Sequence, residues 1–211
     1  MSRGRFITFE GGEGAGKSTQ LKRLAARLEA GGREVVATRE PGGSPGAESI
    51  RELVLNGAAD RWSPVTETLL MYAARRDHVE RVIRPALARG AWVVCDRFAD
   101  STRAYQGAAG GTDPALIAAL ETHILEDTRP DLTLIFDFPP EAGLKRALSR
   151  PGAEARFESK GMAFHERLRE GFLAIAKAEP ARCVIIEAQG GLEDVEAQVW
   201  ATVRDRLQVH G

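Results

Sequence analysis

Short apolar runs alternate with helix-like segments along almost the whole chain. The runs are apolar on both of their faces, which is typical of strands that are covered on both sides of a sheet. Strands of this kind that alternate with helices predict a parallel sheet with helices on both faces, joined by right-handed crossovers. The five predicted strands are residues 6–9, 34–37, 92–95, 132–136 and 184–186.

The predicted helices follow from the spacing of their apolar residues and from their end signals. A helix after the first strand is stopped by Gly31 and Gly32, and a long helical pattern over 64–89, which we expect to be broken in the middle, ends at Gly90. No repeat or linker divides the chain, so we expect one α/β domain over residues 1–211. The other predicted helices cover residues 114–126 with Asp113 as N-cap, 140–149, 160–178, and a closing segment that carries Val195, Val199 and Val203.

Composition and charge exclude several classes of function. The chain has 211 residues, with 30 acidic and 29 basic side chains, so no overall positive charge draws it to nucleic acid or to an anionic membrane. Cys95 and Cys183 lie in apolar runs without a Cys-x-x-Cys spacing, which argues against a disulfide framework or a zinc site and favours a cytoplasmic location. We expect no signal peptide, because the first residues, Met-Ser-Arg-Gly-Arg-Phe, contain no apolar segment, and no membrane span, because no apolar run approaches about 18 residues.

The loop after the first strand has the clearest chemical signature. Its sequence, Gly-Gly-Glu-Gly-Ala-Gly-Lys-Ser, fits G-x-x-x-x-G-K-[ST] between a predicted strand and a predicted helix. In such a loop the backbone N–H groups surround phosphates, Lys17 neutralises the β- and γ-phosphates, and Ser18 offers a hydroxyl to Mg²⁺. The motif does not distinguish a kinase from a GTPase or a motor. The candidate phosphate-binding residues are Gly11, Gly12, Glu13, Gly14, Ala15, Gly16, Lys17, Ser18 and Thr19.

The loop after the third strand places an acid and a cation together. Asp96 ends a buried strand and is a candidate to hold Mg²⁺ through water or to accept a proton, and Arg97 is a candidate to bind a second phosphate. The alternative is a structural ion pair between these two side chains. Asp137 also follows an apolar strand, but we rank it lower because Phe138 and two prolines come next.

Residues 96–107 carry a resemblance to a known family. Their sequence, Asp-Arg-Phe-Ala-Asp-Ser-Thr-Arg-Ala-Tyr-Gln-Gly, resembles the corresponding segment of bacterial thymidylate kinases, and the similarity runs from Phe6 to about Ala188. The resemblance implies a three-layer P-loop NTPase fold with a small lid, and the transfer of a phosphoryl group from ATP, with Mg²⁺, to dTMP. It also implies a homodimer, to which residues 64–89 could supply the face.

The same resemblance implies roles for the acceptor site. The segment Thr-Arg-Glu-Pro-Gly-Gly after the second strand matches the family, so Arg39 is expected to join Arg97 on the dTMP phosphate, with Pro41 shaping that pocket. Glu13 is expected to contact the 3′-hydroxyl, whereas its charge alone would favour a side chain that points into solvent. Arg75 is expected to hydrogen-bond the base, and Met71 stands where the family often has a stacking Phe.

The resemblance also implies neighbours of the base and a lid. Ser101, Thr102 and Gln106 are expected near the base, and Tyr105 is expected to crowd the sugar. The irregular segment over about 146–158 resembles the lid, whose arginines supply cations to the transition state. Arg150 and Arg156 fit that catalytic role, and the alternative for each is an exposed basic helix end.

Two other functions are compatible with these residues. One is a kinase that acts on another nucleoside monophosphate or on a deoxynucleoside, although the latter would leave Arg39 and Arg97 without a phosphate to bind. The other is a nucleotide-gated switch, but the sequence has no Asn-Lys-x-Asp motif for guanine. Phosphorylation of dTMP to dTDP is therefore the function that we predict.

Overall fold

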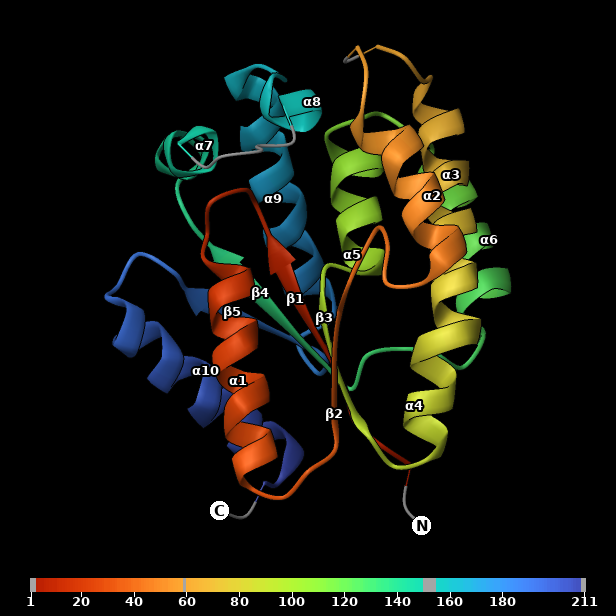
Figure 1. The fold of residues 1–211 in the computed structure, drawn as a ribbon. Coiled ribbons are helices and arrows are strands. Elements are labelled where there is room, and N and C mark those ends of the chain that lie inside the picture. The colour runs from red at the N-terminus through yellow and green to blue at the C-terminus, as the bar shows by residue number, and fades with distance from the viewer. Residues whose placement is uncertain (1–2, 59, 150–154, 210–211) are drawn as a thin grey trace.

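A five-stranded parallel sheet lies at the centre of the molecule (Figure 1). The structure is a computed structural model that describes residues 3–58, 60–149 and 155–209. The strand order is β2-β3-β1-β4-β5, so the phosphate-loop strand is central. All five predicted strands are confirmed, with small shifts at their ends. They are β1 (Phe6–Gly11), β2 (Val35–Arg39), β3 (Trp92–Asp96), β4 (Leu132–Asp137) and β5 (Cys183–Glu187).

Helices cover both faces of this sheet (Figure 1). No helix of the described residues is long and apolar enough to cross a membrane. The α-helices are α1 (Lys17–Ala30), α2 (Pro45–Leu55), α3 (Pro64–His78), α4 (Arg84–Ala88), α5 (Ala99–Thr102), α6 (Pro114–Leu125), α7 (Pro140–Leu148), α8 (Ala155–Glu158), α9 (Met162–Ala178) and α10 (Leu192–Leu207). Two π-helical segments are η1 (Val79–Ile83) and η2 (Arg103–Ala108).

The core is divided by the sheet. On one face, apolar side chains of α1 and α10, such as Leu28 and Val203, pack against Ile7 and Phe136 of the strands. On the other face, residues of η1, α4 and α6 cover β1 and β3, while α9 and η2 cover β4 and β5. The predicted three-layer α/β fold is confirmed, and burial on both faces explains why the central strands β1, β3 and β4 are mostly apolar.

Several elements of the described residues differ from the sequence prediction. The pattern over 64–89 does not separate into two helices, because the π-helical η1 joins α3 to α4. The helix α2 was not predicted, although Pro45 at its first position and Asn56-Gly57 after it are typical end signals. The segment α5–η2 was not predicted either, since its short helix and π-helical turn have no clear period. The prediction that Asp113 caps α6 is confirmed by its bond from Ala115 N at 2.8 Å.

Candidate active site

A cavity of about 580 Å³ opens beyond the carboxyl ends of β1, β2 and β3. This is where ligands bind in open α/β sheets. Its wall is formed by the phosphate loop, the loop after β2, helix α3 and the segment α5–η2, which are far apart in the sequence. The predicted residues on its wall are Glu13, Gly14, Ala15, Gly16, Lys17, Ser18, Thr19, Arg39, Pro41, Met71, Asp96, Arg97, Ser101, Thr102, Tyr105 and Gln106.

The phosphate loop has the backbone geometry that its glycines predict. Gly14 and Gly16 have φ values of 66° and 87°, which glycine adopts without the steric cost of a Cβ atom. A Cβ at Gly14 would lie 2.1 Å from the carbonyl oxygen of Gly143 in α7. Lys17 Nζ donates to the carbonyl oxygen of Gly12 at 2.6 Å, and burial together with the nearby Arg97 lowers the pKa of Lys17 to about 8.

Ser18 and Asp96 are in contact at the N-terminus of α1. Ser18 Oγ donates to Asp96 Oδ2 at 2.5 Å, which joins the phosphate loop to the end of β3. A hydroxyl and a carboxylate at this distance fit the one or two protein ligands that Mg²⁺ takes beside phosphate oxygens and water. Asp137 instead makes two bonds with Arg169, at 2.6 and 2.7 Å. The geometry therefore favours Asp96 over Asp137 as the metal-associated acid.

Arg97 bridges the phosphate loop and α5. Its backbone is left-handed, with a φ of 69°, and its guanidinium donates to Gly11 O at 2.9 Å and to Glu13 Oε1 at 2.8 Å. Tyr105 also donates to Glu13, at 2.5 Å. Burial opposes the ionisation of Glu13, but the charges of Arg97 and Lys17 outweigh it and lower its pKa to about 2. The structure therefore turns Glu13 towards Arg97 rather than into solvent, and Arg97 pairs with Glu13 rather than with Asp96.

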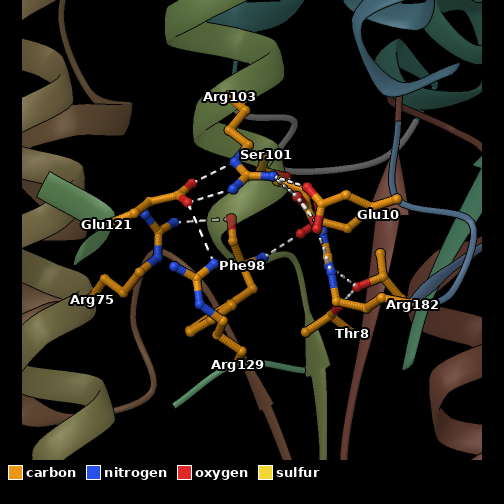
Figure 2. Close-up of polar contacts among 12 residues, drawn as sticks. Thr8, Glu10, Arg75, Phe98, Ser101, Arg103, Glu121, Arg129 and Arg182 are labelled. Atoms are coloured by element: carbon orange, nitrogen blue, oxygen red, sulfur yellow. Dashed lines mark hydrogen bonds and ion pairs between the residues drawn. The ribbon is translucent and has the colours of Figure 1, made fainter. Parts of the chain in front are cut away.

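A buried carboxylate that was not predicted from the sequence holds the residues that follow Arg97. Glu10, near the end of β1, accepts hydrogen bonds from Phe98 N at 2.7 Å and from Ser101 Oγ at 2.5 Å (Figure 2). Burial, with a contribution from the charge of Asp100, raises the pKa of Glu10 to about 7. The sequence offered one signal of its importance, which is the position of Glu10 directly before the glycine loop. The sequence of an apolar strand does not indicate, however, which groups an acid within it will contact.

Two arginines reach the cavity from β2 and α2. Arg39, the last residue of β2, lies on the wall and pairs with Glu48 of α2 at 3.2 Å, and its contact with the acceptor phosphate stays a prediction. Arg51 of α2 also lines the cavity and donates to Pro41 O at 2.6 Å. Arg51 was missed because α2 was missed; the end signals of that helix would have placed Arg51 in a helix directly after the loop, but not on the cavity wall.

The residues expected around the base do not all face the cavity. Met71, Ser101, Thr102, Tyr105 and Gln106 are on its wall and remain predicted substrate contacts. Arg75 is instead 2% exposed and absent from the lining residues. Its guanidinium donates to Glu40 at 2.7 Å, to Thr102 Oγ1 at 3.0 Å and to Phe98 O at 2.9 Å. In this structure Arg75 is thus held behind Thr102, and its predicted contact with the base stays a prediction.

The structure describes only one of the two predicted lid arginines, Arg150 and Arg156. Arg150 lies outside the described residues. Arg156, in α8, points away from the cavity: its guanidinium pairs with Glu67 of α3 at 2.5 Å and donates to the carbonyl oxygen of Val54. The structure therefore does not place Arg156 beside the phosphates, because a buried carboxylate holds it elsewhere. Phe157, its neighbour, does line the cavity and packs edge-on against Tyr105 at 5.6 Å.

The fold and the site together define a class. A phosphate loop on the central strand, with arginines from two neighbouring loops facing it across one cavity, is the arrangement of a P-loop kinase whose acceptor carries a phosphate. Comparison with known proteins then identifies the family.

A family model described as thymidylate kinase matches residues 9–199. A thymidylate kinase of Caulobacter vibrioides is 69% identical over 98% of this chain and 99% of its own length, and one of Bradyrhizobium diazoefficiens is 56% identical over 97% and 91%. A crystal structure of thymidylate kinase from Ehrlichia chaffeensis is 35% identical, with a TM-score of 0.79 over 95% of this chain and 99% of that one. The chain belongs to the thymidylate kinase family, whose reaction converts dTMP to dTDP.

Proposed function

We propose that the chain phosphorylates dTMP with ATP as donor, the two nucleotides meeting end to end in the cavity described above. The observation that carries this proposal is that Lys17 and the phosphate loop share one cavity with Arg39 and Arg97. Two separate groups of cations and N–H donors at one site suit two anionic tails. Phosphoryl transfer depends mainly on such positioning and on neutralising charge.

On the donor side, the phosphate loop and Lys17 hold the β- and γ-phosphates of ATP. Ser18 and Asp96 are the residues that would hold Mg²⁺, which when bound neutralises the charge that develops on the transferring group. Replacement of the Ser18–Asp96 bond, 2.5 Å long, by contacts to the ion would require only small shifts.

On the acceptor side, Arg97 and Arg39 orient the dTMP phosphate, and Glu13 contacts the sugar. An oxygen of the dTMP phosphate attacks the γ-phosphorus, the bond from that phosphorus to the β–γ bridging oxygen breaks, and ADP leaves with the electron pair. The acceptor oxygen is already ionised, so no strong base is needed. The nucleoside side of the site is formed by the cavity-wall residues Met71, Ser101, Thr102, Tyr105 and Gln106, with Pro41 at its edge. Arg75, which donates to Thr102 from behind it, is assigned to the base.

The lid completes the site in this proposal. Closure over the phosphates excludes water, which would otherwise compete as acceptor. Arg150 is the lid cation assigned to the transition state. Arg156 would have to leave Glu67 before it could join Arg150 there.

Replacement of the two central cations tests the assignment. We expect Lys17→Ala and Arg97→Ala each to lower kcat at least about 10³-fold, because each removes a charge from the transferring group or its acceptor. The assay couples ADP formation to NADH oxidation and offers dTMP, thymidine, dUMP and AMP in turn. Lys22→Ala, on the exposed face of α1, is the matched control. Turnover like that of the wild type in either variant, or thymidine as the best acceptor, would refute the proposal.

We also propose a cytoplasmic homodimer. Both cysteines are buried free thiols, which suits a reducing compartment. Val65 and Leu69, one turn apart on α3, and Leu53 on α2 are exposed apolar side chains of neighbouring helices, and a second copy would cover them. Light scattering after size-exclusion chromatography is expected to give twice the mass of 22.9 kDa, and Leu69→Asp is expected to give the monomer.

A further inference from the structure

Glu67 is a buried carboxylate that the proposed reaction does not use. It lies one turn before Met71 on α3 and is 4% exposed. Its Oε1 accepts a hydrogen bond from Gln106 Nε2 at 2.8 Å, and its Oε2 pairs with Arg156 Nη1 at 2.5 Å. One side chain therefore joins the wall of the cavity, through Gln106, to the lid helix α8, through Arg156.

Arg156 determines what Glu67 can offer to Gln106. A guanidinium has donors only, and Arg156 uses others of its donors on the carbonyl oxygens of Val54 at 3.0 Å and Ala58 at 3.1 Å. In the ion pair with Arg156, Glu67 is the carboxylate anion. A carboxylate anion accepts hydrogen bonds and cannot donate one, so Glu67 faces Gln106 as an acceptor.

The orientation of the Gln106 amide follows from this chemistry. Since Glu67 only accepts, the NH₂ group of Gln106 turns towards it, and the carbonyl oxygen Oε1 points the other way. Gln106 is a cavity-wall residue, and among the described residues the structure gives its Oε1 no hydrogen-bond donor. Oε1, the amide atom that does not face Glu67, is therefore the atom that Gln106 has left for a ligand.

We propose that Glu67 is a positioning residue that sets the base preference of the cavity by fixing the Gln106 amide. The inference rests on the proposed function, in which Gln106 neighbours the base. Thymine and uracil carry an N3–H donor on their hydrogen-bonding edge, whereas N3 of cytosine is an acceptor. A carbonyl oxygen at Gln106 accepts from the first two and repels the third; a reversed amide would do the opposite.

Glu67→Gln tests the orientation directly. Arg156 has only hydrogen-bond donors, so it will bind the carbonyl oxygen of the glutamine at position 67. The NH₂ group of that glutamine then faces Gln106. Gln106 must then reverse, so that its own NH₂ group faces the cavity. We expect the ratio of kcat/KM for dTMP to that for dCMP to fall about tenfold to a hundredfold, the effect of one mismatched buried hydrogen bond.

A second substitution distinguishes orientation from general damage. In Glu67→Gln with Arg156→Met, no guanidinium binds the carbonyl oxygen of the glutamine at position 67. That oxygen can then face Gln106 and restore the original orientation of the Gln106 amide. We expect the double variant to recover the dTMP preference to within about threefold, whatever happens to its absolute rate. Replacing both members of the ion pair leaves no buried charge without its partner, so the double variant keeps the test open if the single variant unfolds.

The ratio of the two substrates is the deciding measurement, since loss of a purely structural contact would lower both values of kcat/KM together. Glu52→Gln, an exposed carboxylate on α2, is the matched control and is expected to keep the wild-type ratio. An unchanged ratio in Glu67→Gln, or a double variant that stays as unselective as the single one, would overturn the inference. If instead the wild-type chain does not phosphorylate dTMP, the proposed function has failed and not this inference alone.

Discussion

Replacement of Glu10 by glutamine isolates the electrostatic cost of a carboxylate buried beneath the acceptor loop. Glu10 is 0% exposed and accepts from Phe98 N and Ser101 Oγ (Figure 2). A glutamine has nearly the same shape: its carbonyl oxygen can accept from Phe98, and its NH₂ group can donate to the Ser101 hydroxyl. Glu10→Gln therefore removes the charge and leaves both contacts possible.

The size of the effect follows from the pKa of Glu10, which burial and the charge of Asp100 raise from 4.5 to about 7, against the opposing effects of Ser101 and Arg97. Between these two pH values the folded state holds a proton that the unfolded chain has released. The contribution of Glu10 to stability is therefore fully present below pH 4.5 and is lost as the pH rises to 7. The pKa difference corresponds to about 3 kcal/mol, at about 1.4 kcal/mol for each pH unit.

Urea unfolding of both proteins from pH 4.5 to pH 8 measures this loss. Groups that do not interact with Glu10 cancel in the difference between the two proteins, so the free energy of unfolding of Glu10→Gln should gain about 3 kcal/mol relative to the wild type across the window and level off above pH 7. Glu170→Gln, an exposed carboxylate on α9, is expected to show no such trend. A difference that stays constant with pH would show that Glu10 titrates as an ordinary carboxyl and would refute the reasoning.

Two further substitutions probe the frame around the site. Arg182→Met removes the nearer of two cationic partners of buried Asp100, which Arg182 contacts at 2.6 and 3.1 Å and Arg103 at 3.4 Å, and is expected to lower the free energy of unfolding in urea by about 3 kcal/mol. Arg204→Met, from an exposed pair, should cost at most about 1 kcal/mol, and equal losses in the two variants would contradict the burial argument. Gly14→Ala combines a φ of 66° with a Cβ only 2.1 Å from Gly143 O, so the phosphate loop must shift. We expect a rise of at least about tenfold in the KM for ATP; Gly190→Ala, whose Cβ would meet nothing closer than 3.5 Å, should leave that KM unchanged, and a normal KM in Gly14→Ala would exclude the clash.

Local sequence patterns were sufficient for the sheet and for the phosphate loop. The central strands β1, β3 and β4 are buried along nearly their whole length and are therefore mostly apolar. The less buried edge strands β2 and β5 keep short runs rich in β-branched residues, so all five can be found without knowledge of their partners. The glycine loop is equally local, because the positive φ values of Gly14 and Gly16 and the position of Lys17 are set within eight residues. The strand order β2-β3-β1-β4-β5 is a different matter, since it depends on which strands pair across the whole chain.

Long-range pairings decided what the charged side chains do. The sequence predicts that Arg75, Arg97 and Arg156 lie near the site, but an arginine carries no local signal of which carboxylate it will meet. Arg97 faces Glu13, whereas Arg156 is taken by Glu67, 89 residues away in sequence. Helix α2, missed in the sequence, brings Arg51 to the cavity. The free energy of a buried ion pair depends on the three-dimensional contact of both partners, and only the folded chain supplies that contact.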